Sequence, residues 1–166
     1  MVPAQEGRDA MITLVQGNIL ESKAEALVNP VNTVGVMGAG LALAFKRTFP
    51  DNFEAYDHAC REGEVRVGKM FVFARYELLG PSWIINFPTK DHWRHSSKIE
   101  YIEDGLIDLA KVIENKSIKS VAIPPLGCGL GGLNWADVLP KIMYSLEWFP
   151  RVKIDIFEPK SPTRGT

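Results

Sequence analysis

A lysine follows directly after a short apolar run in the segment NFPTKDHWRHSS, residues 86–97. When neutral, a lysine can act as a nucleophile; when charged, it can stabilise negative charge that develops on a substrate. Lys90 is either a solvated residue at a strand end or a candidate catalytic residue, with Thr89 beside it as a candidate ligand contact. Both residues stand where a buried strand is expected to end.

Cationic and aromatic side chains follow Lys90, and this mixture is typical of proteins that bind single-stranded nucleic acid. The candidate DNA-binding residues are His92, Trp93, Arg94, His95 and Lys98. The alternative is an ordinary polar loop, in which Ser96 or Ser97 caps a helix expected from residue 99.

Two glycine-rich segments each stand between a strand-like run and a helical pattern. They are NTVGVMGAGLA, residues 32–42, and PLGCGLGGLNW, residues 125–135. Glycines let backbone amides approach a ligand closely, and a helix N-terminus adds partial positive charge, so each segment predicts phosphate binding. Together they are expected to converge on a diphosphate. The candidate contacts are Gly35, Val36, Met37, Gly38, Ala39 and Gly40 in the first loop, and Gly127, Cys128, Gly129, Leu130, Gly131 and Gly132 in the second.

The second loop also has the spacing GxGxxG at Gly127, Gly129 and Gly132, with Glu158 at the end of the next strand. This spacing is that of a Rossmann dinucleotide site. Against that reading, the loop belongs to the last strand–helix–strand unit of the chain. Neither loop is a Walker A motif, because no GK[ST] follows. A ligand with adjacent phosphates is expected in either case.

Three asparagines stand at strand ends or within a strand. Asn18, in QGNIL, can cap the segment that follows or meet the edge of a nucleobase. Asn29 is expected to be buried and to tie down loop backbone. Asn32 opens the first glycine loop, where it is expected to meet a ligand hydroxyl.

The order of strands and helices predicts an α/β fold, a three-layer α/β/α sandwich with a mixed, mostly parallel sheet. Ligands of such sheets bind at the carboxyl ends of the strands, where both glycine loops fall. Strands are expected near 12–16, 26–31, 70–75, 82–87, 119–124 and 152–157, and helices near 40–49, 51–61, 99–114 and 135–149.

The chain's 166 residues suit one domain, and its net charge of −1 means that any nucleic-acid contact must come from a local patch. Two cysteines without paired spacing predict neither a disulfide framework nor a metal site, and indicate a cytoplasmic protein. No apolar run reaches the roughly 18 residues of a membrane span. The domain is expected to cover residues 11–158, with residues 1–10 a disordered arm or an added remnant and residues 159–166 a tail or linker.

The segments GNIL, VNPVN, GVMGAGLA and PLGCGLGGLNW, in this order, resemble the macrodomain family, whose members are α/β/α modules that bind ADP-ribose. MGAGLALAFKRTFP and NFPTK resemble the branch that includes terminal ADP-ribose glycohydrolase and the bacterial DarG antitoxin macrodomains, with the DarG group the nearer. The resemblance implies an enzyme that removes ADP-ribose from thymidine in single-stranded DNA. It also implies a cognate DarT-type toxin as partner, through this domain or one after residue 166. No cofactor is implied, since ADP-ribose is the ligand.

The resemblance also implies roles for residues of the site. Lys90 would be catalytic, Asn32 would orient the distal ribose, Asn18 and Ile19 would contact the adenine end, and Leu130 and Phe157 would be apolar walls, as would Met37. The terminal glycohydrolases carry an aspartate where this chain has Gly131, so Lys90 lacks that carboxylate. Thymine leaves as a stabilised anion, which makes a strong general acid less necessary. Two alternatives stay open: hydrolysis of glutamyl- or aspartyl-linked ADP-ribose on protein, and ADP-ribose binding without catalysis.

Overall fold

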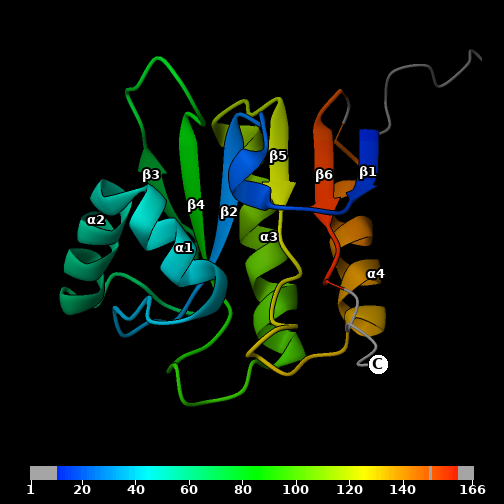
Figure 1. The fold of residues 1–166 in the computed structure, drawn as a ribbon. Coiled ribbons are helices and arrows are strands. Elements are labelled where there is room, and N and C mark those ends of the chain that lie inside the picture. The colour runs from blue at the N-terminus through cyan, green and yellow to red at the C-terminus, as the bar shows by residue number, and fades with distance from the viewer. Residues whose placement is uncertain (1–10, 150, 161–166) are drawn as a thin grey trace, which may run out of the picture.

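The computed structural model describes residues 11–149 and 151–160, and within them one six-stranded sheet (Figure 1). The sheet has the order β1-β6-β5-β2-β4-β3, parallel except for β3, which pairs antiparallel with β4. The mixed, mostly parallel sheet expected from the sequence is confirmed. The strands are β1 (Met11–Val15), β2 (Ala26–Val31), β3 (Phe71–Ala74), β4 (Trp83–Pro88), β5 (Ser120–Ile123) and β6 (Lys153–Phe157).

Helices cover both faces of this sheet. In Figure 1, α1 (Gly40–Thr48) and α2 (Pro50–Arg61) lie over one face, while α3 (Ile99–Asn115) and α4 (Trp135–Leu146) lie over the other. A short 3-10 helix, η1 (Ile19–Glu21), follows β1. Among the described residues no helix is both long and apolar enough to cross a membrane. The expected arm at residues 1–10 and residues 161–166 of the expected tail lie outside the described residues.

The alternation of side chains along β4 shows why its sequence is apolar apart from Asn86. Ile85 and Phe87 pack in the core formed with α3 and α4, whereas Ile84 packs with Phe45 of α1 on the opposite face. A strand buried on both faces carries a continuous apolar run instead of an alternating one. At Gly105 of α3, an added Cβ would lie 2.3 Å from the Phe87 ring, so the glycine lets this helix approach the sheet closely.

Two alternatives raised by the sequence do not hold: a serine cap for α3 and a Rossmann dinucleotide site. α3 begins at Ile99 with Lys98 at the capping position and no side-chain cap, and Ser97 is buried instead of capping the helix. The strand order also differs from the 3-2-1-4-5-6 order of a Rossmann sheet. Glu158, the acidic residue of that reading, accepts a hydrogen bond from the side-chain amide of Gln16.

The topology brings three loops to one end of the molecule, the lower end in Figure 1. Residues 32–39 follow β2, residues 89–98 follow β4 and residues 124–134 follow β5. β2 lies between β4 and β5 and runs parallel to both, so the carboxyl ends of the three strands are adjacent. Any site built by these loops must lie at this edge.

Candidate functional site

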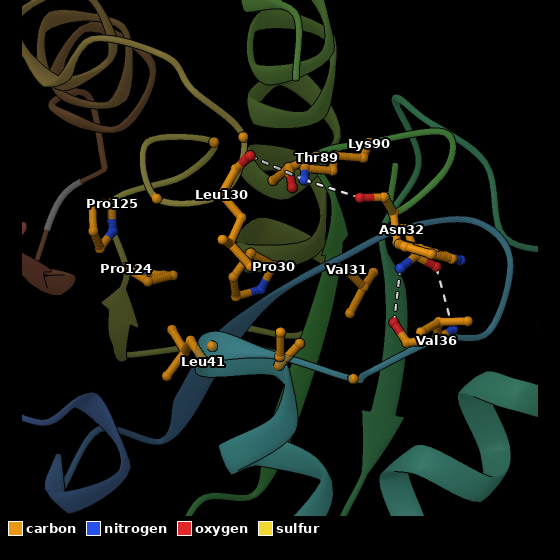
Figure 2. A pocket seen from close by; sticks show the side chains of 18 residues that line it. Pro30, Val31, Asn32, Val36, Leu41, Thr89, Lys90, Pro124, Pro125 and Leu130 are labelled. Atoms are coloured by element: carbon orange, nitrogen blue, oxygen red, sulfur yellow. Dashed lines mark hydrogen bonds between the residues drawn. The ribbon is translucent and has the colours of Figure 1, made fainter. Parts of the chain in front are cut away.

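A cavity of about 520 Å³ opens between the three loops, a size typical of small-molecule sites (Figure 2). Lys90, Asn32 and both glycine loops contribute to it. Its lining includes the candidates Asn32, Val36, Gly38, Ala39, Gly40, Thr89, Lys90, Trp93, Gly127, Gly129, Leu130 and Gly131. It also includes six residues that the sequence analysis missed: Pro30, Val31, Leu41, Ala42, Pro124 and Pro125.

The two glycine loops face each other, and the N-termini of the helices that follow them differ in capping and charge. A Cβ added at Gly40 would lie 3.7 Å from the Leu130 side chain, so the loops meet there. α1 begins with Ala39 as N-cap, without a side-chain cap and without an acidic residue in its first turn. By contrast, the Asn134 side chain caps α4 and Asp137 stands in its first turn. The N-terminus of α1 is therefore the better site for a phosphate.

Asn32 is held by a network that shapes the first loop. Its Oδ1 accepts hydrogen bonds from the backbone N–H groups of Val34 (3.0 Å) and Val36 (3.3 Å), and its Nδ2 donates to the Val36 carbonyl oxygen (2.7 Å). The hydroxyl of buried Tyr56 lies 2.7 Å from the Asn32 carbonyl oxygen and 2.9 Å from its Oδ1. Burial raises the pKa of Tyr56, which keeps this hydroxyl a donor. One N–H of the Asn32 amide is left for a ligand hydroxyl.

Lys90 joins the second glycine loop to the loop that follows β4. Its Nζ donates to the carbonyl oxygens of Leu130 (3.2 Å) and Trp93 (3.5 Å), and Figure 2 shows the contact with Leu130. The strand end that carries it is fixed to β2, since the Thr89 N–H donates to the Val31 carbonyl oxygen at 2.8 Å. A charged lysine has three N–H donors, so one stays available to a substrate oxygen in the cavity.

Gly131 explains why no carboxylate stands beside Lys90. A Cβ at this position would lie 2.4 Å from the Gly127 carbonyl oxygen and 2.4 Å from the Ser97 hydroxyl oxygen. Neither distance is compatible with a side chain. The Ser97 Oγ is itself buried and has no hydrogen-bond partner among the described residues, while the Ser97 N–H donates to the Gly131 carbonyl oxygen at 3.0 Å. The backbone packing of this loop therefore requires glycine where an aspartate was noted as missing.

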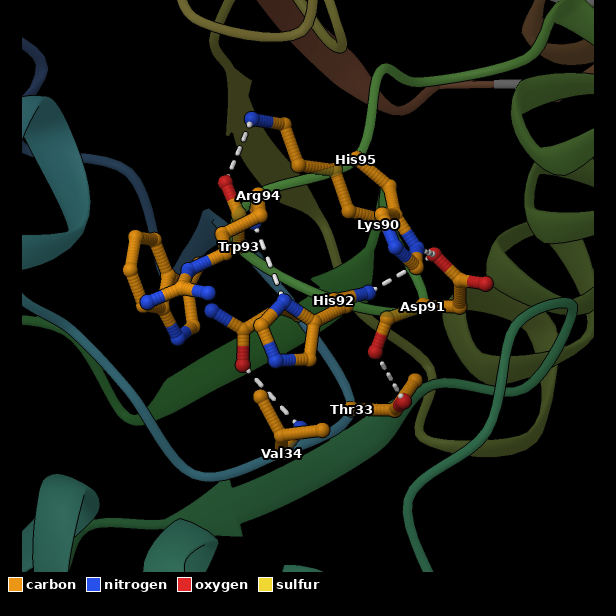
Figure 3. A network of polar contacts seen from close by, with 9 residues as sticks. Thr33, Val34, Lys90, Asp91, His92, Trp93, Arg94 and His95 are labelled. Carbon is orange, nitrogen blue, oxygen red and sulfur yellow. Dashed lines mark hydrogen bonds and ion pairs between the residues drawn. The ribbon is translucent and has the colours of Figure 1, made fainter.

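The loop after Lys90 is organised around Asp91 (Figure 3). The Asp91 carboxylate accepts the His92 N–H at 2.7 Å and lies 2.9 Å from Nδ1 of His95. The hydrogen bond with His95 is the main cause that lowers the pKa of Asp91. The Thr33 hydroxyl donates to the Asp91 carbonyl oxygen at 2.6 Å, which ties this loop to the first glycine loop.

Several candidates lie outside the cavity lining. Met37 is 1% exposed and packs in a core cluster with Val31 and Tyr56, so the expectation that it is a cavity wall is wrong. Cys128 is half-buried beside the main core, and burial raises the pKa of its thiol to about 11, so it stays protonated at neutral pH. The others outside the lining are Asn18, Ile19, Gly35, Gly132, Phe157, His92, Arg94, His95 and Lys98.

The residues expected at the adenine end lie beyond Leu41. Ile19 and Phe157 are buried in one core cluster, against which the cavity residue Leu41 also packs. Asn18 caps η1, because its Oδ1 accepts the Leu20 N–H at 3.0 Å. Its contact with a nucleobase stays a prediction. Asn29 donates to the Asn86 side chain at 3.1 Å and to the Met37 sulfur at 3.9 Å, so it contacts the first glycine loop through a side chain instead of through loop backbone.

A family model for the macro domain matches residues 28–142. The chain belongs to the macrodomain family. A curated protein of Thermus aquaticus, named DNA ADP-ribosyl glycohydrolase, is 52% identical to this macrodomain over 90% of its length and 41% of the relative's. The macrodomain thus spans about two fifths of that relative.

Two solved structures show the same fold. The macrodomain of Mycobacterium tuberculosis DarG is 53% identical, superposes with a TM-score of 0.89, and the match covers 91% of this chain and 99% of that one. Thermosipho africanus DarTG, solved in complex with ADP-ribose, is 36% identical with a TM-score of 0.82, over 93% of this chain and 45% of that one.

Proposed function

We propose that this macrodomain hydrolyses the bond between ADP-ribose and thymidine in single-stranded DNA, and that it acts as the antitoxin of a DarT-type DNA ADP-ribosyltransferase. One observation carries the proposal: Lys90 lies in the cavity with its Nζ anchored to the Leu130 and Trp93 carbonyl oxygens. The similarity to DNA ADP-ribosyl glycohydrolases over most of the chain supports the DNA substrate. A cytoplasmic location fits the two free cysteines.

We propose one orientation for ADP-ribose in the cavity. The diphosphate would lie at the N-terminus of α1 against the amides of the second loop, since that helix end carries no competing acid. The distal ribose would then lie towards Asn32 and Lys90, and the adenosine would extend past Leu41 towards Ile19 and Phe157. Asn18 would meet the adenine through the second lone pair of its Oδ1.

In this orientation Lys90 would act electrostatically. Water attacks C1″ of the distal ribose and loses a proton to solvent, the C1″–N bond breaks, and thymine leaves as an anion that takes up a proton from solvent. A charged Nζ close to the departing atoms stabilises the negative charge that develops on the base. Gly131 allows no carboxylate to assist, which agrees with a leaving group that needs no strong acid.

The substrate is tested by measuring ADP-ribose release from a thymidine-modified single-stranded oligonucleotide beside a glutamyl-ADP-ribosylated protein. Turnover of the oligonucleotide alone or by preference is expected. Turnover of the modified protein alone would identify the domain as an ester hydrolase. Binding of ADP-ribose without turnover of either substrate would identify it as a non-enzymatic ADP-ribose-binding module.

The role of Lys90 is tested by adding borohydride during turnover. A neutral lysine that attacked C1″ would form an imine with the opened ribose, and reduction would leave an adduct on Lys90 detectable by mass spectrometry. The electrostatic role predicts no adduct. Lys111→Ala, an exposed lysine of α3, is the matched control for Lys90→Ala.

A further inference from the structure

We propose that the Trp93 indole is a stacking platform for a nucleobase of the substrate strand and that the Arg94 guanidinium moves from it to a phosphate when the base arrives. The inference rests on the proposed function, because it concerns the DNA on which Lys90 acts. It assigns separate roles within the loop that follows Lys90.

Trp93 belongs both to the cavity and to the surface. It lines the cavity with Lys90 and Leu130, yet it is 47% exposed. A large aromatic side chain usually buries most of its surface. A half-exposed one at the mouth of a cavity therefore has free surface that a ligand can contact. The strand that continues from the modified base would leave the cavity beside this ring, which places a neighbouring base of that strand against the indole.

The position of Trp93 is fixed by the backbone around it. Its carbonyl oxygen accepts from Lys90 Nζ, the Arg94 N–H donates to Nδ1 of His92 (3.1 Å), and the His95 N–H donates to the His92 carbonyl oxygen (3.0 Å). Asp91 anchors the same turn (Figure 3). An aromatic ring on a preorganised turn loses little conformational entropy when a ligand stacks on it.

The present neighbours of the ring show what it can bind. The His92 ring stacks on it with centroids 5.3 Å apart and planes at 30°, and the Arg94 guanidinium lies 4.6 Å from the indole centroid. The indole ring therefore already contacts one aromatic side chain and one cationic side chain. Arg94 is exposed, so a base can displace it at little cost, and its fork of N–H donors suits a phosphate of the same strand.

This arrangement selects an unpaired strand over a duplex. Stacking on a side chain needs a base whose face is free, and such contacts tolerate any base because every base has a π-face. A single modified nucleoside has neither a neighbouring base nor a phosphate, so it would gain less from the platform.

The test compares hydrolysis of a thymidine-modified single-stranded oligonucleotide with hydrolysis of the modified nucleoside. Trp93→Ala is expected to lower kcat/KM on the oligonucleotide by about 5- to 150-fold, the range of one lost base stack. The loss on the nucleoside should be several-fold smaller, and Trp93→Phe should recover most of the oligonucleotide rate. Trp148→Ala, with a tryptophan 73% exposed outside the cavity lining, is the matched control.

A binding measurement separates this inference from the proposed function. With ADP-ribose saturating the cavity, an unmodified single strand should bind the wild type more tightly than Trp93→Ala. Arg94→Gln should reduce the salt dependence by about one phosphate contact, a slope change of roughly 0.7. Strand binding without hydrolysis would overturn the proposed function and keep the platform. Equal losses of both substrates in Trp93→Ala, or no strand binding, would overturn the platform.

Discussion

Replacing Gly131 by alanine tests the backbone packing that excludes a carboxylate from the site. The added Cβ would lie 2.4 Å from both the Gly127 carbonyl oxygen and the Ser97 Oγ, about 1 Å short of the 3.4 Å at which ordinary contact begins. Gly127 cannot move aside easily, because its carbonyl oxygen accepts the Leu133 N–H at 2.9 Å.

Overpacking of this kind costs about 1–3 kcal/mol. Gly131→Ala should lower the free energy of unfolding of the ligand-free protein by that amount, with a melting temperature lower by about 2–4 °C for each kcal/mol. Because Leu130 precedes the altered residue, the contact between its carbonyl oxygen and Lys90 Nζ should weaken as well. ADP-ribose binding should therefore weaken together with stability.

Gly129→Ala is the matched control in the same loop. Gly129 is exposed, nothing lies within 4 Å of its added Cβ, and its φ is outside the left-handed region. Alanine there should be neutral or stabilise the protein by about 0.4–1 kcal/mol through the unfolded chain. Urea unfolding followed by fluorescence, together with calorimetry of ADP-ribose binding, gives both quantities. The steric reasoning is refuted if the two alanine variants have the same urea midpoint of unfolding. It is also refuted if Gly131→Asp raises the rate of hydrolysis.

Two further predictions concern the polar networks that hold the loops. Tyr56→Phe should lower the free energy of unfolding by about 1–3 kcal/mol and weaken ADP-ribose binding, because buried acceptors of Asn32 lose their donor; wild-type values for both in denaturation and calorimetry would contradict the network. The lowered pKa of Asp91 means that its contribution to loop structure is present above the ordinary aspartate pKa and is lost as pH falls through the lowered value. An NMR titration of Asp91 should show this lowered pKa and its return towards the ordinary value in His95→Ala, and an unchanged pKa in the variant would contradict the role of His95.

Sequence patterns were sufficient to predict the strands, the helices and the edge of the sheet at which the cavity lies. Each of the six strands and four helices expected from the sequence has its counterpart among the described elements, because apolar runs and helical periodicity report burial directly. The two glycine loops and Lys90 line one cavity, as expected of loops after parallel strands. Pro124 and Pro125 could have been added by the same reasoning, since they directly follow β5.

What the sequence could not supply depends on contacts between distant residues. Tyr56 reaches the Asn32 backbone from α2, and nothing in its local pattern distinguishes it from an ordinary core aromatic. Met37 lies in a loop that reads as ligand-binding, yet it turns inward to the core beside Tyr56. The requirement for glycine at position 131 comes from Gly127 and Ser97, the latter from a different loop. Each of these facts is a tertiary contact, which local pattern does not encode.

Lys90 is the residue on which the account depends, and a single-turnover measurement tests it most directly. With protein in excess over a thymidine-modified single-stranded oligonucleotide, the rate of ADP-ribose release reports chemistry without product dissociation. We expect Lys90→Ala to lower this rate by about 100- to 1,000-fold, the range for removing one electrostatic donor, while ADP-ribose still binds. Release at the wild-type rate by Lys90→Ala would contradict the account.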